Sequence, residues 1–222
     1  FLSDLRGCES LLQGVAQIPH EAVMGLIRFS LAQADRVSAA ALTRAYMAGM
    51  DEVPWPTRVV ATDDGLIVDR PESESGCFYI PWKVEGFCEM TLSTASLMER
   101  SRPYLLEVEL ARGTLNRIRN QLATWEQAGL VIPDPIRTRL REVTEVFSRA
   151  VTSQPDQQRA AKLASEVLAE ALSITVSLGA AYAQQALSIQ HAAGNKLGTL
   201  LGANLGEKPL EKSVAEHFTR TF

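Results

Sequence analysis

A change in hydrophobic period near Pro103 constrains this 222-residue chain more than any other feature. Before Pro103, apolar and polar residues alternate in short runs bounded by turn residues, a pattern typical of β-strands. After it, apolar residues recur every three to four positions over long segments, which indicates amphipathic helices. Strands and helices kept in separate segments favour an α+β fold. We expect a small antiparallel, β-sandwich-like domain followed by a helical region.

The first segment, residues 24–103, contains about five strand-like runs. Two of them, Arg58–Thr62 and Leu66–Asp69, flank Asp63-Asp64-Gly65, whose Asp-Gly chemistry predicts a tight hairpin turn. The other elements that we expect are a strand over Gly25–Leu31, a short helix over alanine-rich Ala39–Met50, and a hairpin in which Cys77–Val84 turns at Glu85-Gly86 into Phe87–Leu92.

The second segment, residues 104–196, predicts three helices joined by short turns that contain Pro and Asp. Short connections of this kind favour an antiparallel three-helix bundle. Gly129 is placed to end the first helix and Asp156 to cap the third, which exceeds 30 residues and should end near Gly194. The buried stripe expected for the first helix is Tyr104, Val108, Ala111, Leu115, Ile118, Leu122 and Trp125.

The last segment, residues 197–222, predicts one strand over its Gly-punctuated apolar run and one helix after Pro209. A single strand and helix cannot bury both faces of a sheet, so we expect the first βα unit of a larger, incomplete domain. At the other end, Met24 opens an apolar run and is a candidate start. Residues 1–23 are then an extension of uncertain role.

Composition narrows the classes of partner. A net charge of -4 argues against a nucleic-acid partner, because binding the phosphate backbone requires clustered Lys and Arg. Neither a signal peptide nor a run of ~20 apolar residues is visible, so we expect no membrane partner, and the compartment stays open. The basic residues Arg112, Arg117 and Arg119 are interleaved with Glu107, Glu109 and Glu126, which indicates a solvated helix face.

Metal and cofactor sites are not expected either. The cysteines Cys8, Cys77 and Cys88 are too few and too scattered for a zinc site. We interpret Cys77 and Cys88 as two buried thiols, with a bond between them as the alternative. The three histidines, His20, His191 and His217, lack any ligand spacing.

No catalytic motif is complete. Ser93–Ser96 lacks a nucleophile-elbow pattern, and Gly198–Gly206 fits no phosphate-binding loop. Glu107 and Glu109 are two residues apart and therefore point to different sides of a helix. We therefore assign no catalytic residue to this segment.

Aromatic side chains are the remaining candidates for a site. A pyranose ring presents an apolar C–H face, which an exposed aromatic ring can bind as a flat platform. Strand alternation places Trp82 on the core side and Tyr79 on the outer side, and Trp55 lies in an extended segment between two prolines. Trp55 and Tyr79 are the candidate carbohydrate-binding residues, with ordinary half-buried packing as the alternative.

Three runs carry a resemblance to a known family: Leu92–Arg100, Pro103–Leu106 and Glu109–Gln121, the last reading ELARGTLNRIRNQ. They resemble the region that precedes the catalytic barrel in large bacterial glycoside hydrolases of family 10, the xylanase-like proteins common in planctomycetes. The resemblance extends over about residues 24–222 and is most specific over residues 92–125.

The resemblance also implies an identity for the end of the chain. Leu200–Leu205 and Leu210–Phe222 look like the first strand and helix of the family's (β/α)₈ barrel, which needs about 250 residues. The family's two catalytic glutamates lie on later strands, so no catalytic residue carries over to this segment. The full protein is then expected to cleave β-1,4-xylan or a related glycan with retention, using carboxylates ~5 Å apart.

Several hypotheses follow. The chain is the non-catalytic accessory region of such a hydrolase, with polysaccharide and its own C-terminal barrel as partners. The alternative is a stand-alone protein-interaction module that docks through its Arg- and Glu-rich first helix. If the chain is an accessory region of a hydrolase, its β domain either binds sugar itself or acts as a structural spacer.

Overall fold

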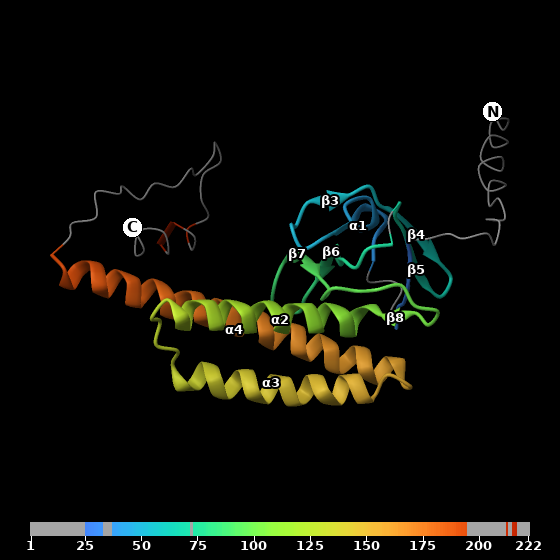
Figure 1. Ribbon diagram of the computed structural model, residues 1–222. Coiled ribbons are helices and arrows are strands. Elements are labelled where there is room, and N and C mark those ends of the chain that lie inside the picture. The colour runs from blue at the N-terminus through green and yellow to red at the C-terminus, as the bar shows by residue number, and fades with distance from the viewer. Residues whose placement is uncertain (1–24, 33–36, 72, 195–211, 213–214, 217–222) are drawn as a thin grey trace. The chain divides into compact units, whose positions relative to one another are not determined.

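The computed structural model describes residues 25–32, 37–71, 73–194, 212 and 215–216. Contacts divide the chain into two compact units, residues 1–178 and residues 179–222. Within the described part, the first unit contains all the strands, the helices α1 to α3, and the helix α4 as far as Leu178. Strands therefore precede the long helices, and the expected α+β class is confirmed (Figure 1).

The strands of the first unit form two four-stranded sheets. The first sheet has the order β4 (Arg58–Thr62), β5 (Gly65–Asp69), β1 (Leu26–Ser30) and β8 (Tyr104–Leu105). The second has the order β3 (Pro54–Trp55), β2 (Tyr46–Ala48), β6 (Cys77–Lys83) and β7 (Glu89–Ser93).

Both predicted hairpins are confirmed, β4–β5 and β6–β7. In β4–β5, Thr62 pairs with Gly65, so Asp63 and Asp64 form the two-residue turn. Gly65 has φ of 155°, and a Cβ there would lie 2.0 Å from the carbonyl oxygen of Phe29. Glycine at this position thus allows β5 to lie against β1.

Two expectations about the β part are wrong. The strands are not all antiparallel, because β8 pairs in parallel with β1 at the edge of the first sheet. The helix expected over Ala39–Met50 covers only α1 (Ala39–Thr43), and β2 follows it. The hydroxyl of Ser38 caps α1, while Tyr46 and Met47 pair with β6. Pairing in the sheet here overrides the helix propensity of the alanine-rich run.

The core of the β part lies between the two sheets. Phe29 of the first sheet stacks on Phe78 of the second, with ring centroids 5.0 Å apart. Ile80 and Trp82 follow Phe78 at alternate positions and are also buried. The predicted inward face of β6 is therefore confirmed, because successive residues of a strand point to opposite faces.

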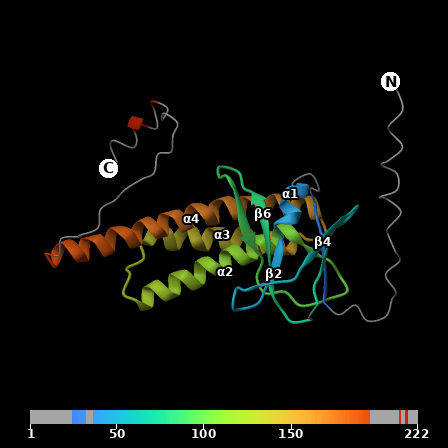
Figure 2. The same ribbon diagram turned by 90° about the horizontal axis from the view of Figure 1, so that it is seen from above.

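The helices α2 (Leu106–Gln127) and α3 (Asp134–Thr152) follow and run antiparallel (Figures 1 and 2). Gly129, with φ of 96°, ends α2 as predicted. The N–H of Gly129 donates to Glu126 and that of Leu130 to Trp125, which completes a Schellman motif. The predicted α2 stripe is buried at Val108, Ala111, Leu115, Ile118 and Leu122.

The helix α4 (Gln157–Ala192) is 36 residues long, in agreement with the prediction. A carboxylate oxygen of Asp156 accepts a hydrogen bond from the N–H of Arg159 at 3.1 Å, so the predicted cap is confirmed. Arg139 of α3 donates to Glu170, Ser173 and Ser177 of α4. This network joins α3 to α4 within the first unit.

Among the described residues, α4 is also the one helix long and apolar enough to cross a membrane by length and composition. The criterion is a mean hydropathy over a window of this helix, so it does not test the expectation that the sequence has no continuous run of ~20 apolar residues. One third of its most apolar window is buried inside the protein. The buried residues of α4 end at Leu178, which is where the first unit ends.

In the second unit, the described residues are the end of α4 from Gly179 onward, the turn at Gly194, and three helical residues, Lys212, Ala215 and Glu216. Leu187 and Ile189 of this part are exposed. The strand expected within residues 197–206 and the extension of residues 1–23 lie outside the described residues.

Candidate functional site

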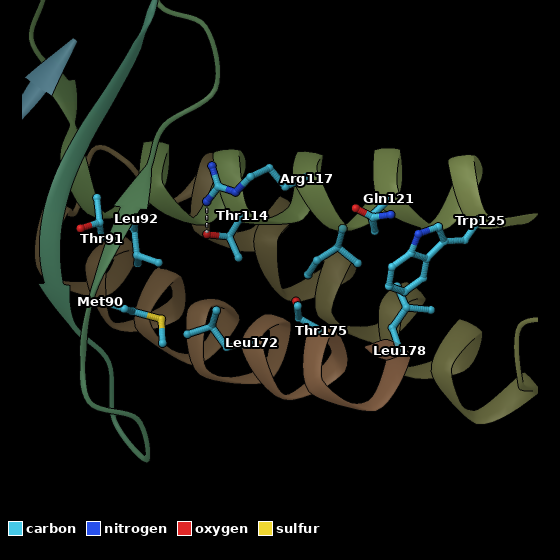
Figure 3. A pocket seen from close by; sticks show the side chains of 11 residues that line it. Met90, Thr91, Leu92, Thr114, Arg117, Gln121, Trp125, Leu172, Thr175 and Leu178 are labelled. Atoms are coloured by element: carbon cyan, nitrogen blue, oxygen red, sulfur yellow. Dashed lines mark hydrogen bonds between the residues drawn. The ribbon is translucent and has the colours of Figure 1, made fainter. Parts of the chain in front are cut away.

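A cavity of about 290 Å³ opens between β7, α2 and α4, entirely within the first unit (Figure 3). Three elements that are distant in sequence meet there. The strand β7 provides Met90, Thr91 and Leu92; the helix α2 provides Thr114, Arg117, Ile118, Gln121 and Trp125; the helix α4 provides Leu172, Thr175 and Leu178.

The approach of α2 to β7 depends on one glycine. A Cβ added at Gly113 would lie 2.1 Å from the carbonyl oxygen of Ser93 and 2.4 Å from the carbonyl carbon of Thr94. No larger residue fits at this point without a shift of the backbone. Gly113 therefore sets the separation of α2 and β7 beside the cavity.

Helical periodicity then aligns the lining residues of α2. Thr114, Arg117, Gln121 and Trp125 are spaced by three or four residues and so fall on one side of the helix. From the first to the last, the helix rises by about 16 Å at 1.5 Å per residue. The lining is thus a groove along three turns of α2, with Trp125 and Leu178 at one end (Figure 3).

The lining combines an apolar floor with a polar margin. Leu92, Ile118 and Leu178 are buried, while Gln121 and Thr175 are exposed. Trp125 is half-buried and presents part of its indole to the cavity. Concave sites that bind small molecules commonly have this composition, in which apolar surface provides affinity and a few polar groups fix orientation.

Arg117 is the charged member of the described lining. One of its terminal nitrogens donates to the carbonyl oxygen of Ser93 at 3.1 Å and to the Ser93 hydroxyl. The other donates to the Thr114 hydroxyl at 3.4 Å, the bond drawn in Figure 3. Burial lowers the pKa of Arg117, although nearby Tyr79, Cys77 and Glu52 oppose this effect. Arginine remains charged at neutral pH even after such a shift.

The structure does not bring together the two aromatic residues predicted from the sequence. Trp55 pairs with Met47, which also pairs with Phe78, so Trp55 shares the inner face of the second sheet. Tyr79 pairs with Tyr46 on the opposite face. One flat platform cannot include both Trp55 and Tyr79.

Each of these two aromatic residues has close neighbours of its own. The Tyr79 ring stacks on Tyr46 with centroids 4.8 Å apart, and burial raises the pKa of Tyr79. The Trp55 ring lies against Gly49 and Gly76, because a Cβ at either glycine would approach it within 2.8 Å. The guanidinium of Arg70 lies 5.6 Å from the centroid of the Trp55 ring.

The glutamates near the start of α2 do not lie on a solvated face, so that expectation was wrong for this part of the helix. Glu107 and Glu109 are 1% and 5% exposed. A carboxylate oxygen of Glu107 accepts from the N–H of Ala32 at 3.0 Å, and Glu109 forms an ion pair with Arg112 at 2.9 Å. Glu107 thus joins the start of α2 to the segment after β1, whereas the Glu109 pair lies within α2.

Within the described ranges, no group of three or more His, Cys, Asp or Glu residues is placed to hold a metal ion. Cys77 and Cys88 are free thiols, so the alternative of a disulfide between them is wrong. Cys88 is exposed, which also contradicts its interpretation as a buried thiol.

Sequence reasoning missed the cavity because it assigned Trp125 to the packed stripe of α2. Periodicity places a residue on the inner side of a helix, but it does not show where the partner helix ends or diverges. The sequence does contain one feature that indicates the cavity. A row of polar residues on α2 runs beside its apolar stripe: Thr114, Arg117 and Gln121.

Comparisons with protein-family models, with curated proteins and with solved structures find no match to this chain.

Proposed function

We propose that this chain is the non-catalytic N-terminal accessory region of a glycoside hydrolase acting on β-1,4-xylan or a related plant-type polysaccharide, and that it binds a sugar unit in the cavity between β7, α2 and α4. The observation that carries this proposal is the cavity itself, with the Trp125 indole beside an apolar floor and hydrogen-bonding groups at its margin.

This arrangement suits the chemistry of a pyranose ring. The C–H face of the sugar packs on the indole, while its hydroxyls exchange hydrogen bonds with Gln121 and donate to the Thr175 oxygen. Gln121 has both donors and acceptors in its amide group, whereas the Thr175 hydroxyl donates to the carbonyl oxygen of Ala171 at 3.0 Å and keeps its lone pairs to accept from a sugar. Such a set recognises a neutral sugar without any charged partner.

The remaining parts of the chain have supporting roles in this proposal. The helices α2, α3 and α4 form an antiparallel three-helix bundle that braces the β part against the catalytic barrel. Residues 197–222 begin that barrel, and its later strands provide the two catalytic glutamates. The resemblance over residues 92–125 supports this assignment.

Retention of the chain on insoluble xylan tests the proposal. The wild-type chain is expected to be retained, and Trp125→Ala should reduce retention about tenfold or more, since aromatic anchors contribute about 1.5 kcal/mol or more. Tyr182→Ala is the matched control, because Tyr182 is an exposed aromatic residue of α4 that does not line the cavity. Unchanged retention of a folded Trp125→Ala chain would refute the proposed site.

The alternative function is a stand-alone interaction module that binds a partner protein. It is favoured by the apolar side chains exposed along α4, among them Val176, which is 64% exposed. This alternative predicts self-association or partner binding that Val176→Lys abolishes while retention on xylan is unchanged. Light scattering coupled to size-exclusion chromatography distinguishes the two functions.

A further inference from the structure

Resting on the proposed function, we infer that the cavity selects an acidic glycan: Arg117 binds the carboxylate of a hexuronic acid unit, while a neighbouring neutral sugar of the same chain packs on Trp125. The inference depends on the charge, the hydrogen bonds and the position of Arg117.

The charge of Arg117 is not neutralised by a carboxylate at contact distance. The ion pairs among the described residues join other groups, and none of them includes Arg117. Its described hydrogen-bond acceptors are the neutral oxygens of Ser93 and Thr114. The described cavity lining contains no Asp or Glu, so Arg117 is its one charged group, and Glu52 acts on it from outside the lining. An anion that enters the cavity neutralises this charge.

Arg117 also keeps hydrogen-bonding capacity for a ligand. A guanidinium has five N–H donors, and the described bonds to Ser93 and Thr114 use at most three of them. At least two donors remain, which is the number needed for a bidentate bond to a carboxylate. The bonds to Ser93 and Thr114 also restrain the guanidinium, so less side-chain entropy is lost on binding.

The position of Arg117 determines how a sugar chain is placed. Arg117 and Trp125 are eight residues apart on one side of α2, a rise of about 12 Å. This separation is too large for one pyranose to stack on Trp125 and also place its own carboxylate on Arg117. Two linked units span the groove, with the acidic unit beside β7 and the neutral unit at the end formed by Trp125 and Leu178.

Isothermal titration of the 222-residue chain with two xylan oligosaccharides tests the inference. One oligosaccharide carries a single glucuronic acid branch, and the other is the same oligosaccharide without the branch. We expect about tenfold tighter binding of the branched compound at low salt, because a charge-assisted bidentate bond adds to the contacts that both compounds make. The ratio should fall toward one in high salt, which screens the ion pair.

Arg117→Gln should remove the preference for the branched oligosaccharide, so that the ratio of the two affinities falls to about one. Arg141→Gln is the matched control; it removes an exposed arginine of α3 that does not line this cavity, and the preference should persist. Equal affinity of the wild-type chain for both compounds overturns the inference but leaves the proposed function intact. A preference that survives in Arg117→Gln also overturns it. Binding of neither compound overturns both proposals.

Discussion

Cys77 and Cys88 lie at opposite ends of the β6–β7 hairpin and differ in environment. Cys77 is half-buried on β6, whereas Cys88 is exposed. Burial raises the pKa of the Cys77 thiol, against the opposing effect of Arg117. The unfolded chain ionises this thiol near pH 8.5, while the folded chain keeps it protonated to higher pH. The Cys77 thiol therefore makes its full contribution to stability below the pKa of the unfolded chain. This contribution is lost as the pH rises toward the pKa of the folded chain.

We therefore predict that the free energy of unfolding falls between pH 7.5 and 9.5, and that Cys77→Ala makes this fall less steep. One group changes the slope by at most about 1.4 kcal/mol per pH unit, because the unfolded state releases one proton more than the folded state. Urea titrations at several pH values measure how the free energy of unfolding changes with pH. Cys88→Ala should keep the wild-type slope; if both variants behave alike, Cys77 is not the titrating group.

Arg70 and Glu99 form the most buried ion pair among those described. The Arg70 side chain is fully buried, the Glu99 side chain is 33% exposed, and their nearest charged atoms lie 3.7 Å apart. A carboxylate oxygen of Glu99 also accepts from the N–H of Gly25 at 2.5 Å. Removal of the Glu99 charge leaves the Arg70 guanidinium buried without its partner, a situation that costs stability.

Glu99→Gln is predicted to lower the free energy of unfolding by about 1–3 kcal/mol, less than for a fully buried pair because Glu99 is partly solvated. Glu89→Gln is the comparison, since Glu89 pairs with Arg44 at the surface, where both side chains are about half exposed. That change should cost under about 1 kcal/mol. Equal losses in the two variants would show that burial of Arg70 does not control the energy of its pair.

At the scale of elements, sequence pattern predicted what depends on neighbours along the chain. The β4–β5 turn, the alternation of β6, and the ends of α2 and α4 follow from local chemistry that a sequence shows directly. The parallel pairing of β8 and the change from α1 to β2 depend on partners distant in sequence. The cavity depends on three such elements, so its residues were recognisable only after β7, α2 and α4 were placed.

Two glycines within helices allow a direct test of how elements pack. Gly113 of α2 meets the backbone of Ser93 and Thr94, whereas a Cβ at Gly179 of α4 has no neighbour within 4 Å. Gly113→Ala is predicted to destabilise the protein by about 1–3 kcal/mol, since α2 must move away from β7. Gly179→Ala should stabilise it by up to about 1 kcal/mol through helix propensity.

Chemical denaturation of the two glycine variants measures both changes. A Gly113→Ala protein as stable as wild type would mean that α2 and β7 separate without cost, and the cavity lined by both elements would then not have a fixed width.

At the scale of the whole molecule, the core of the described residues ends where the first unit ends. The buried hydrophobic residues run from Ile27 to Leu178, and the cavity lining also ends at Leu178. The stability and the binding that we attribute to the first unit should thus not require residues beyond α4. Cooperative unfolding of a small domain reports on one such core.

A chain that ends at Gly194 is therefore predicted to unfold cooperatively, with a free energy of unfolding within about 1 kcal/mol of the full chain, and to keep the same retention on xylan. A chain that ends at Glu166 loses Val167, Ala171, Ile174 and Leu178, all buried in α4, and should fail to unfold cooperatively. Each lost side chain contributes about 1–3 kcal/mol, so their sum approaches the whole stability of a domain. If the chain ending at Gly194 also lost its cooperativity, residues 195–222 would be part of the core, and the first unit would not be an independent binding module.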